Sequence, residues 1–300
     1  MPGRDGINKI VASNSNMKNA LVIFSFLICS SCASPGQVSV NTPQNMFRQY
    51  PIEYSASATA RSEIEGAWKS FCSENALSFA APEFDSITNT PLSLPQGLSG
   101  KVLLTEKKQI ASELELRESL RSFIQKNSFL LFSDHDFETT GLGNLTLVSF
   151  SRELRRKPVL ETDVYQAVYH QTSYNYPIEN GYGVLRLSIA ANGLLMQVNS
   201  RLIPRYNLPD QALLPASEII DKILGNEYQI SLPNGQRLSI TPVRKDEASL
   251  KGLVIYPKPA GQRLAIHLAY VVRVGNGKSW SVFVDALTGE NLGSKPDFNY

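Results

Sequence analysis

The sequence has few of the residues from which most catalytic and metal sites are built. Its 300 residues include three cysteines and three histidines, and 29 basic side chains nearly balance 27 acidic ones. Three cysteines are too few for a disulfide framework, and no second Cys-x-x-Cys pair is present to complete a zinc site. A net charge of +2 gives no electrostatic footprint for nucleic acid, so we expect no nucleic-acid partner.

The histidines are also too scattered for a zinc-protease motif, which needs two of them one helical turn apart with an adjacent glutamate. His135, His170 and His267 are far apart, and none is followed by glutamate. We expect His170 and His267 to be ordinary strand residues and His135 to lie in a polar turn. A catalytic triad is recognised only in space, but no Gly-x-Ser-x-Gly elbow or phosphate-binding glycine loop occurs. We therefore predict no catalytic residue, no metal, no cofactor and no enzyme activity.

Long apolar runs are missing too. Residues 20–28 are apolar and uncharged, but a membrane-spanning helix needs about 20 such residues. Lys18 precedes this run and two serines lie directly before Cys32, which is the pattern of an export signal with a lipidated cysteine. We predict a lipoprotein signal peptide over residues 1–32, with translation starting at Met17.

Lipidation of Cys32 would anchor the exported protein to a membrane. No aspartate follows this cysteine, which favours the bacterial outer membrane over retention in the inner one. The alternative is an ordinary cleaved signal with a chance cysteine, which predicts a periplasmic or extracellular protein.

The region over residues 33–100 is expected to be a tether plus an extra N-terminal segment. Residues 33–58 lack apolar periodicity and predict the tether, and the proline-containing residues 82–100 predict a connecting loop. Between them, apolar side chains at helical spacing predict an amphipathic helix within residues 60–80. Cys72 belongs to that stripe, so we interpret it as a small buried residue rather than a nucleophile.

Beyond this region the pattern predicts a helix followed by antiparallel strands. Leu116, Leu120, Phe123 and Ile124 form an apolar stripe, and we expect a helix over residues 113–132. Apolar side chains then alternate with polar ones over residues 165–170 and again over residues 185–189, and Asn192-Gly193 is a strong hairpin signal. The basic run Arg152, Arg155, Arg156 and Lys157 is interpreted as a solvated loop.

The same order occurs again downstream. A helix is predicted to begin after Pro215 and to end at Gly225, and a hairpin is predicted around Asn234-Gly235. Further strands are expected at residues 253–256, 268–274 and 280–284. The sequence thus predicts an α+β fold made of two subdomains, each a helix plus an antiparallel sheet.

Two sets of motifs resemble a known family. Residues 165–172, Pro177-Ile178, residues 185–187, Asn192-Gly193 and residues 201–204 are similar to the fungalysin/thermolysin propeptide (FTP) motif. Residues 253–257, 268–272 and the string from Trp280 to Glu290 resemble the PepSY part of the same metalloprotease precursors. Tyr176 stands where the family has glycine before the Pro-Val turn, so we expect that turn to be rebuilt with help from Asn175.

The resemblance implies a cystatin-like arrangement, with an FTP-like subdomain at 105–208, a PepSY-like subdomain at 209–292 and a C-terminal tail at 293–300. Its structural motif positions fall on Gln171, Pro177, Asn192, Gly193, Trp280, Asp285 and Gly289. At the last two, we expect the Asp285 carboxylate to accept hydrogen bonds from turn amides and Gly289 to allow the backbone to reverse.

The function implied is non-catalytic. Such propeptides inhibit a thermolysin-like (M4) zinc protease or act as its folding chaperone, so the expected partner is that catalytic domain, beside the membrane contacted through Cys32. One alternative is the propeptide part of an incomplete zymogen, which a His-Glu-x-x-His motif downstream of Tyr300 would reveal. Another is an envelope lipoprotein with a structural or ligand-binding role, because a fold does not determine function.

Overall fold

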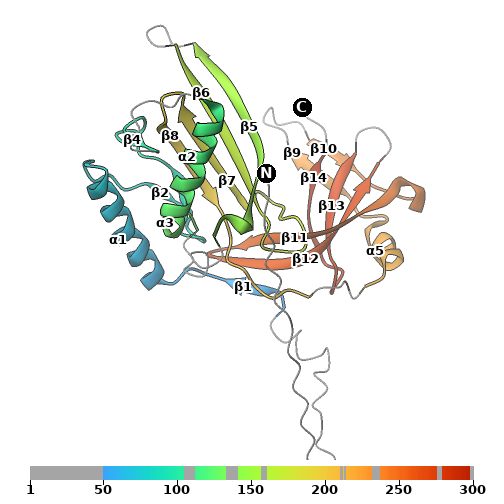
Figure 1. Ribbon diagram of the computed structural model, residues 1–300. Helices are drawn as coiled ribbons and strands as arrows, with labels where there is room; N and C mark the ends of the chain where they lie inside the picture. Colours follow the sequence, from blue (N-terminus) through green and yellow to red (C-terminus); the bar gives the residue numbers. More distant parts are fainter. Residues whose placement is uncertain are drawn as a thin grey trace, which may run out of the picture. The chain divides into compact units, whose positions relative to one another are not determined.

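The structure, a computed structural model, describes residues 50–104, 112–132, 141–156, 161–209, 212, 214–231, 237–275 and 279–297. These residues fall within a single unit, Pro43–Tyr300, and the predicted signal peptide with Cys32 lies outside them. Helices and antiparallel sheets make up this part of the protein, which confirms the α+β fold class (Figure 1). No helix among the described residues is long and apolar enough to cross a membrane.

The first sheet has the strand order β4-β8-β7-β6-β5, and every pair in it is antiparallel. Its strands are β4 (Val102–Leu103), β5 (Leu145–Arg156), β6 (Glu161–Gln171), β7 (Val184–Ala190) and β8 (Leu194–Arg201). The β7–β8 hairpin turns at Asn192-Gly193, where Gly193 has a φ of 81°. This is the hairpin that the sequence predicts.

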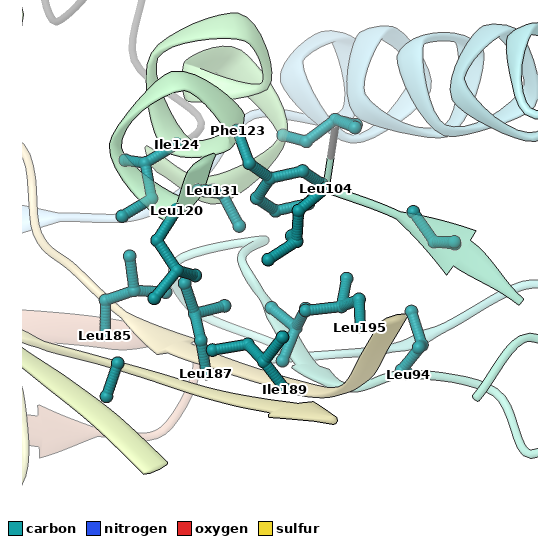
Figure 2. Close-up of a cluster of buried hydrophobic side chains, with 14 of the residues drawn as sticks. Leu94, Leu104, Leu120, Phe123, Ile124, Leu131, Leu185, Leu187, Ile189 and Leu195 are labelled. Atoms are coloured by element: carbon teal, nitrogen blue, oxygen red, sulfur yellow. The ribbon is translucent and has the colours of Figure 1, made fainter. Parts of the chain in front are cut away.

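Helices cover one face of this sheet and supply an apolar core. They are α1 (Ala58–Glu74), α2 (Glu113–Lys126) and α3 (Ser128–Phe132), and the short 3-10 helix η2 (Gly141–Asn144) leads into β5. Leu120 of α2 lies over Leu185 and Leu187 of β7 (Figure 2), and all three are fully buried. The apolar stripe predicted for the helix is therefore the stripe that packs on the sheet.

The second sheet has the order β1-β12-β13-β14, and β11 pairs with β12 as well. Its strands are β1 (Ile52–Tyr54), β11 (Ala248–Ala260), β12 (Arg263–Val274), β13 (Trp280–Asp285) and β14 (Asn291–Pro296). Smaller elements nearby are α5 (Ala216–Ile223), the hairpin β9 (Tyr228–Ser231) with β10 (Arg237–Ile240), and η3 (Lys245–Glu247). Pro215 and Gly225 flank α5 as predicted, whereas Asn234-Gly235 lie outside the described residues.

The expected tether and connecting loop are partly wrong, because both regions contribute strands. Residues 52–54 form β1 and pair with Leu264–Ile266 of the second sheet. Within the expected loop, β2 (Glu83–Phe84) pairs with β3 (Pro91–Ser93). Just after the loop, β4 joins the first sheet. Segments of two or three residues are too short to show a strand period of two. The prolines and polar residues around them therefore favour a loop or tether in the sequence.

Three other boundaries differ from the predictions. The helix expected over 113–132 is interrupted at Asn127, whose side-chain amide donates to the carbonyl of Phe123 at 2.9 Å, a local bond that competes with the helix. Arg152, Arg155 and Arg156 are not in a loop but end β5, where Arg152 pairs with Asp163 across the hairpin. The expected tail begins inside β14.

Candidate functional site

Asp285 ends β13 and organises the turn that follows. Its Oδ1 accepts hydrogen bonds from the backbone amides of Leu287 and Thr288, both at 2.8 Å. The amide of Gly289 donates to the carbonyl of Asp285 at 2.9 Å, and Gly289 has a φ of 74°. This local geometry agrees with the expectation that the carboxylate satisfies turn amides and that glycine permits the reversal.

The other oxygen of Asp285 takes part in a buried cluster that sequence reasoning missed. Tyr50 Oη donates to Asp285 Oδ2 at 2.7 Å, and His267 Nδ1 donates to the same oxygen at 2.7 Å. The rings of Tyr50 and His267 meet edge to face, with centroids 5.9 Å apart. Asp285 is 0% exposed and His267 is 4% exposed, whereas Tyr50 is half-buried, so the acidic and imidazole members of the Tyr50–His267–Asp285 cluster are shielded from solvent.

The cluster fills a gap in the hydrogen bonding along one edge of β12. β1 pairs with residues 264–266 and β13 pairs with residues 269–274, so residues 267 and 268 lie between the two partners. Tyr50 Oη accepts a hydrogen bond from the amide of Leu268 at 3.0 Å, and the carbonyl of Leu268 accepts one from Ala286. A buried backbone amide without a partner costs free energy, and Tyr50 supplies that partner.

The electrostatics of the cluster favour an ionised Asp285. Burial on its own would raise the pKa of this carboxyl, but hydrogen bonds from His267, Tyr50 and the amides of Thr288 and Leu287 lower it below its ordinary value. Burial and the negative charge of Asp285 raise the pKa of the Tyr50 hydroxyl, which therefore stays a donor. Asp285 and His267 are both buried, and together with Tyr50 they complete the hydrogen bonding along β12.

Three further motif positions, Gln171, Pro177 and Trp280, have different structural surroundings. Gln171 is buried at the end of β6; its side chain donates to the carbonyl of Ile203 at 2.7 Å and accepts from the amide of Ile203 at 3.0 Å. The carbonyl of Pro177 accepts from the amide of Ile255 in β11 at 2.8 Å. Trp280 begins β13 and is buried against α5 residues such as Ile219.

The segment after Pro177 joins the first sheet to the second. Ile178 forms an isolated parallel bridge with Ile255, and the side-chain amide of Asn180 donates to the carbonyl of Pro257 at 2.7 Å. Gly183 permits this approach, because a Cβ there would lie 2.7 Å from the Ile178 side chain. Tyr176 packs with the apolar cluster at this contact. The positive φ angles of the segment are at Asn180, Gly181 and Gly183, beyond the position of Asn175, where the rebuilt turn was expected.

The isolated cysteine and the other histidines have simple surroundings. Cys72 is a residue of α1 with a free thiol. It is 1% exposed and belongs to the apolar core, as its place in the apolar stripe predicts. His170 is an exposed residue of β6, and His135 lies outside the described residues. Among the residues that the structure describes, no group of three or more His, Cys, Asp or Glu side chains is placed to hold a metal ion.

β5 is an edge strand of 12 residues. Within the described part of the protein it pairs with β6 alone, so its other edge is free of sheet partners. Val148, at the β-bulge between Leu147 and Ser149, is 50% exposed. Unpaired edges of this length provide backbone donors and acceptors to another extended polypeptide.

Known proteins offer only a weak structural similarity to this chain. No family model matches the sequence, and no curated protein matches it. Among solved structures, a weak neighbour is the Bacillus megaterium YpeB C-terminal domain, with a TM-score of 0.31 and 10% sequence identity, covering 82% of this chain and 100% of that chain. A similarity at this level carries no argument, so the fold class rests on the helices and strands themselves.

Proposed function

We propose that this protein is a non-catalytic binding module that recognises a thermolysin-like zinc metalloprotease, as an inhibitor or a folding chaperone. The proposal includes export and attachment to a membrane through a lipid on Cys32. It rests on the resemblance of residues 165–204 and 253–290 to protease propeptides, combined with one structural observation, the free edge of β5.

The edge of β5 supports recognition of polypeptide backbone. An extended segment of a partner gains main-chain hydrogen bonds when it adds to such an edge, and a preformed strand loses little conformational entropy when it binds. The exposed side chain of Val148 adds apolar contact in the first half of the strand. Charged side chains, lysine above all, are the usual means by which proteins block this kind of pairing. In β5 they occur in the second half, at Arg152, Glu153, Arg155 and Arg156, so the proposed pairing uses the uncharged half around Val148.

The test measures whether the full-length protein alters the behaviour of a thermolysin-like protease from the same cell. We expect stoichiometric inhibition of peptide cleavage, or a higher yield when the denatured protease is refolded with the protein present. Val148→Lys should weaken either effect roughly tenfold, which corresponds to about 1.4 kcal/mol of binding free energy.

Val243→Lys is the matched control, because Val243 is 67% exposed and lies outside the strands. It should behave like the unaltered protein. The proposal is wrong if both inhibition and refolding are indifferent to the protein. Equal losses in the two lysine variants would instead exclude β5 as the recognition edge.

A further inference from the structure

A groove between α2 and the first sheet is lined in part by two residues, each with a buried polar atom that has no hydrogen-bond partner among the described residues. It has a volume of ≈ 470 Å³, which is within the usual range for small-molecule sites. Its walls come from α2, β5 and β6. The lining residues are Leu114, Arg117, Glu118, Arg121, Leu145, Thr146, Leu147 and Tyr169.

Tyr169 provides the first unpartnered group. Its side chain is 3% exposed, and its hydroxyl has no hydrogen-bond partner among the residues that the structure describes. Buried hydroxyls are nearly always hydrogen-bonded, because they lose their contacts with water on folding. This hydroxyl lines the groove, so an acceptor held there would complete its bonding.

Arg117 provides the second. Its Nη2 donates to Glu113 Oε1 at 2.5 Å, and its guanidinium carbon lies 4.6 Å from the centre of the Phe150 ring. Both contacts hold the half-exposed guanidinium at the groove, yet its Nε is buried and has no partner within the described part of the chain. Nε–H of arginine is only a donor, so an acceptor held in the groove would satisfy it.

The charges and apolar groups around these donors restrict the ligand. Arg117 and Arg121 both favour negative charge near the Tyr169 hydroxyl, since they oppose the rise that burial causes in its pKa. Glu118, also in the lining, disfavours a multiply charged anion such as a phosphate. Leu114, Leu145 and Leu147 provide apolar contact for an uncharged body. Glu113 already pairs with Arg117, so the lining suits no more than a single negative charge, carried by an apolar molecule.

We propose that this groove binds an apolar monocarboxylate, whose oxygens accept from Tyr169 Oη and Arg117 Nε while its hydrocarbon part contacts the leucines. The charge of Arg121 compensates the carboxylate. Such a group occurs in a fatty acid and at the C-terminus of an apolar peptide. The groove includes residues 145–147 of β5, next to Val148, but its proposed ligand is a small acid, so the inference does not depend on the proposed protease partner.

Calorimetric titration of the full-length protein distinguishes these sources. The probes are octanoate with octanol as its neutral counterpart, and the tripeptide Ala-Leu-Leu with its C-terminal amide. We expect one acid or both to bind in roughly the submillimolar range, and the neutral counterpart to bind at least about tenfold more weakly, as loss of charge-assisted hydrogen bonds predicts. Binding of octanoate alone identifies a fatty acid, and binding of the peptide acid alone identifies a peptide C-terminus.

Tyr169→Phe separates recognition from stability. It should weaken binding of the acid by roughly tenfold without lowering the urea midpoint of the ligand-free protein, because the removed hydroxyl has no partner to lose. Tyr165→Phe, on the same strand but outside the groove lining, is the control and should bind normally. The inference is overturned if neither acid binds, if the neutral probes bind equally well, or if Tyr169→Phe binds like the unaltered protein.

Discussion

The two sheets of this protein are stabilised by different kinds of interaction. The first buries one face under α1, α2 and α3 with apolar side chains such as Leu120, Leu185 and Leu187. The second depends in addition on an ionised group, because Asp285 and Tyr50 complete the edge of β12 where β1 and β13 do not meet. An apolar layer tolerates a range of residues of suitable volume, whereas each partner of a buried charge needs a particular donor at a particular place.

Replacing Asp285 with alanine should have the largest effect. The change leaves the hydroxyl of Tyr50, Nδ1 of His267 and two turn amides without their acceptor, and removal of one member of such a buried group typically costs about 3–5 kcal/mol. Urea unfolding followed by circular dichroism measures the loss. Asp246→Ala is the control, since Asp246 forms only an exposed ion pair with Arg244. A loss below about 1 kcal/mol would mean that the cluster is not what holds the second sheet together.

Replacing Leu120 with alanine tests the packing of the first sheet, again through the free energy of unfolding. Leu120 is 0% exposed, and a cavity at such a site costs about 2–4 kcal/mol. Leu114→Ala on the same helix, where the side chain is 67% exposed, should cost about 0.5 kcal/mol or less. The measurement is the same urea titration. Similar values for the two leucines would contradict the assigned orientation of α2.

Tyr50→Phe should give the smallest loss, about 1–2 kcal/mol at pH 7, because it removes one donor to Asp285 and leaves the Leu268 amide unpaired. The loss should also depend on pH. The lowered pKa of Asp285 contributes stability that is present above its unfolded value of about 3.9 and disappears as the pH falls through the lower folded value. Without the Tyr50 donor this contribution shrinks.

Urea midpoints at pH 7 and pH 3 test this dependence. The difference in unfolding free energy between the unaltered protein and Tyr50→Phe should be larger at pH 7 than at pH 3. A difference that is the same at both values would show that Tyr50 acts only through its ring and the Leu268 amide, and not through the Asp285 carboxylate.

The parts of the fold that sequence predicts well are those with local signals. The stripe through Ile64 and Trp68 predicts α1, and Asn192-Gly193 predicts a hairpin, because helix period and turn conformation depend on neighbouring residues. β5 was missed because a bulge after Leu147 breaks the alternation and its far end carries arginines that favour a loop interpretation.

Of the candidate site, the sequence predicted only the interactions between residues close together in the chain. The bonds from Asp285 to the amides of Leu287 and Thr288 span two or three residues, so the motif from Trp280 to Glu290 carries them. Tyr50 and Asp285 are 235 positions apart, and nothing local to Tyr50 marks it as a partner. The donors in the groove at Tyr169 were also invisible, because a missing hydrogen bond exists only in three dimensions.

The pairing of β1 with β12 sets an order for assembly. A ribosome makes residues 50–54 before any of the strands that they join, and more than 200 residues separate Tyr50 from its contacts at Leu268 and Asp285. Contacts of such long range form late and slow the folding of a domain. The first described strand of this protein therefore stays without its β12 partner until residues 264–266 have been synthesised.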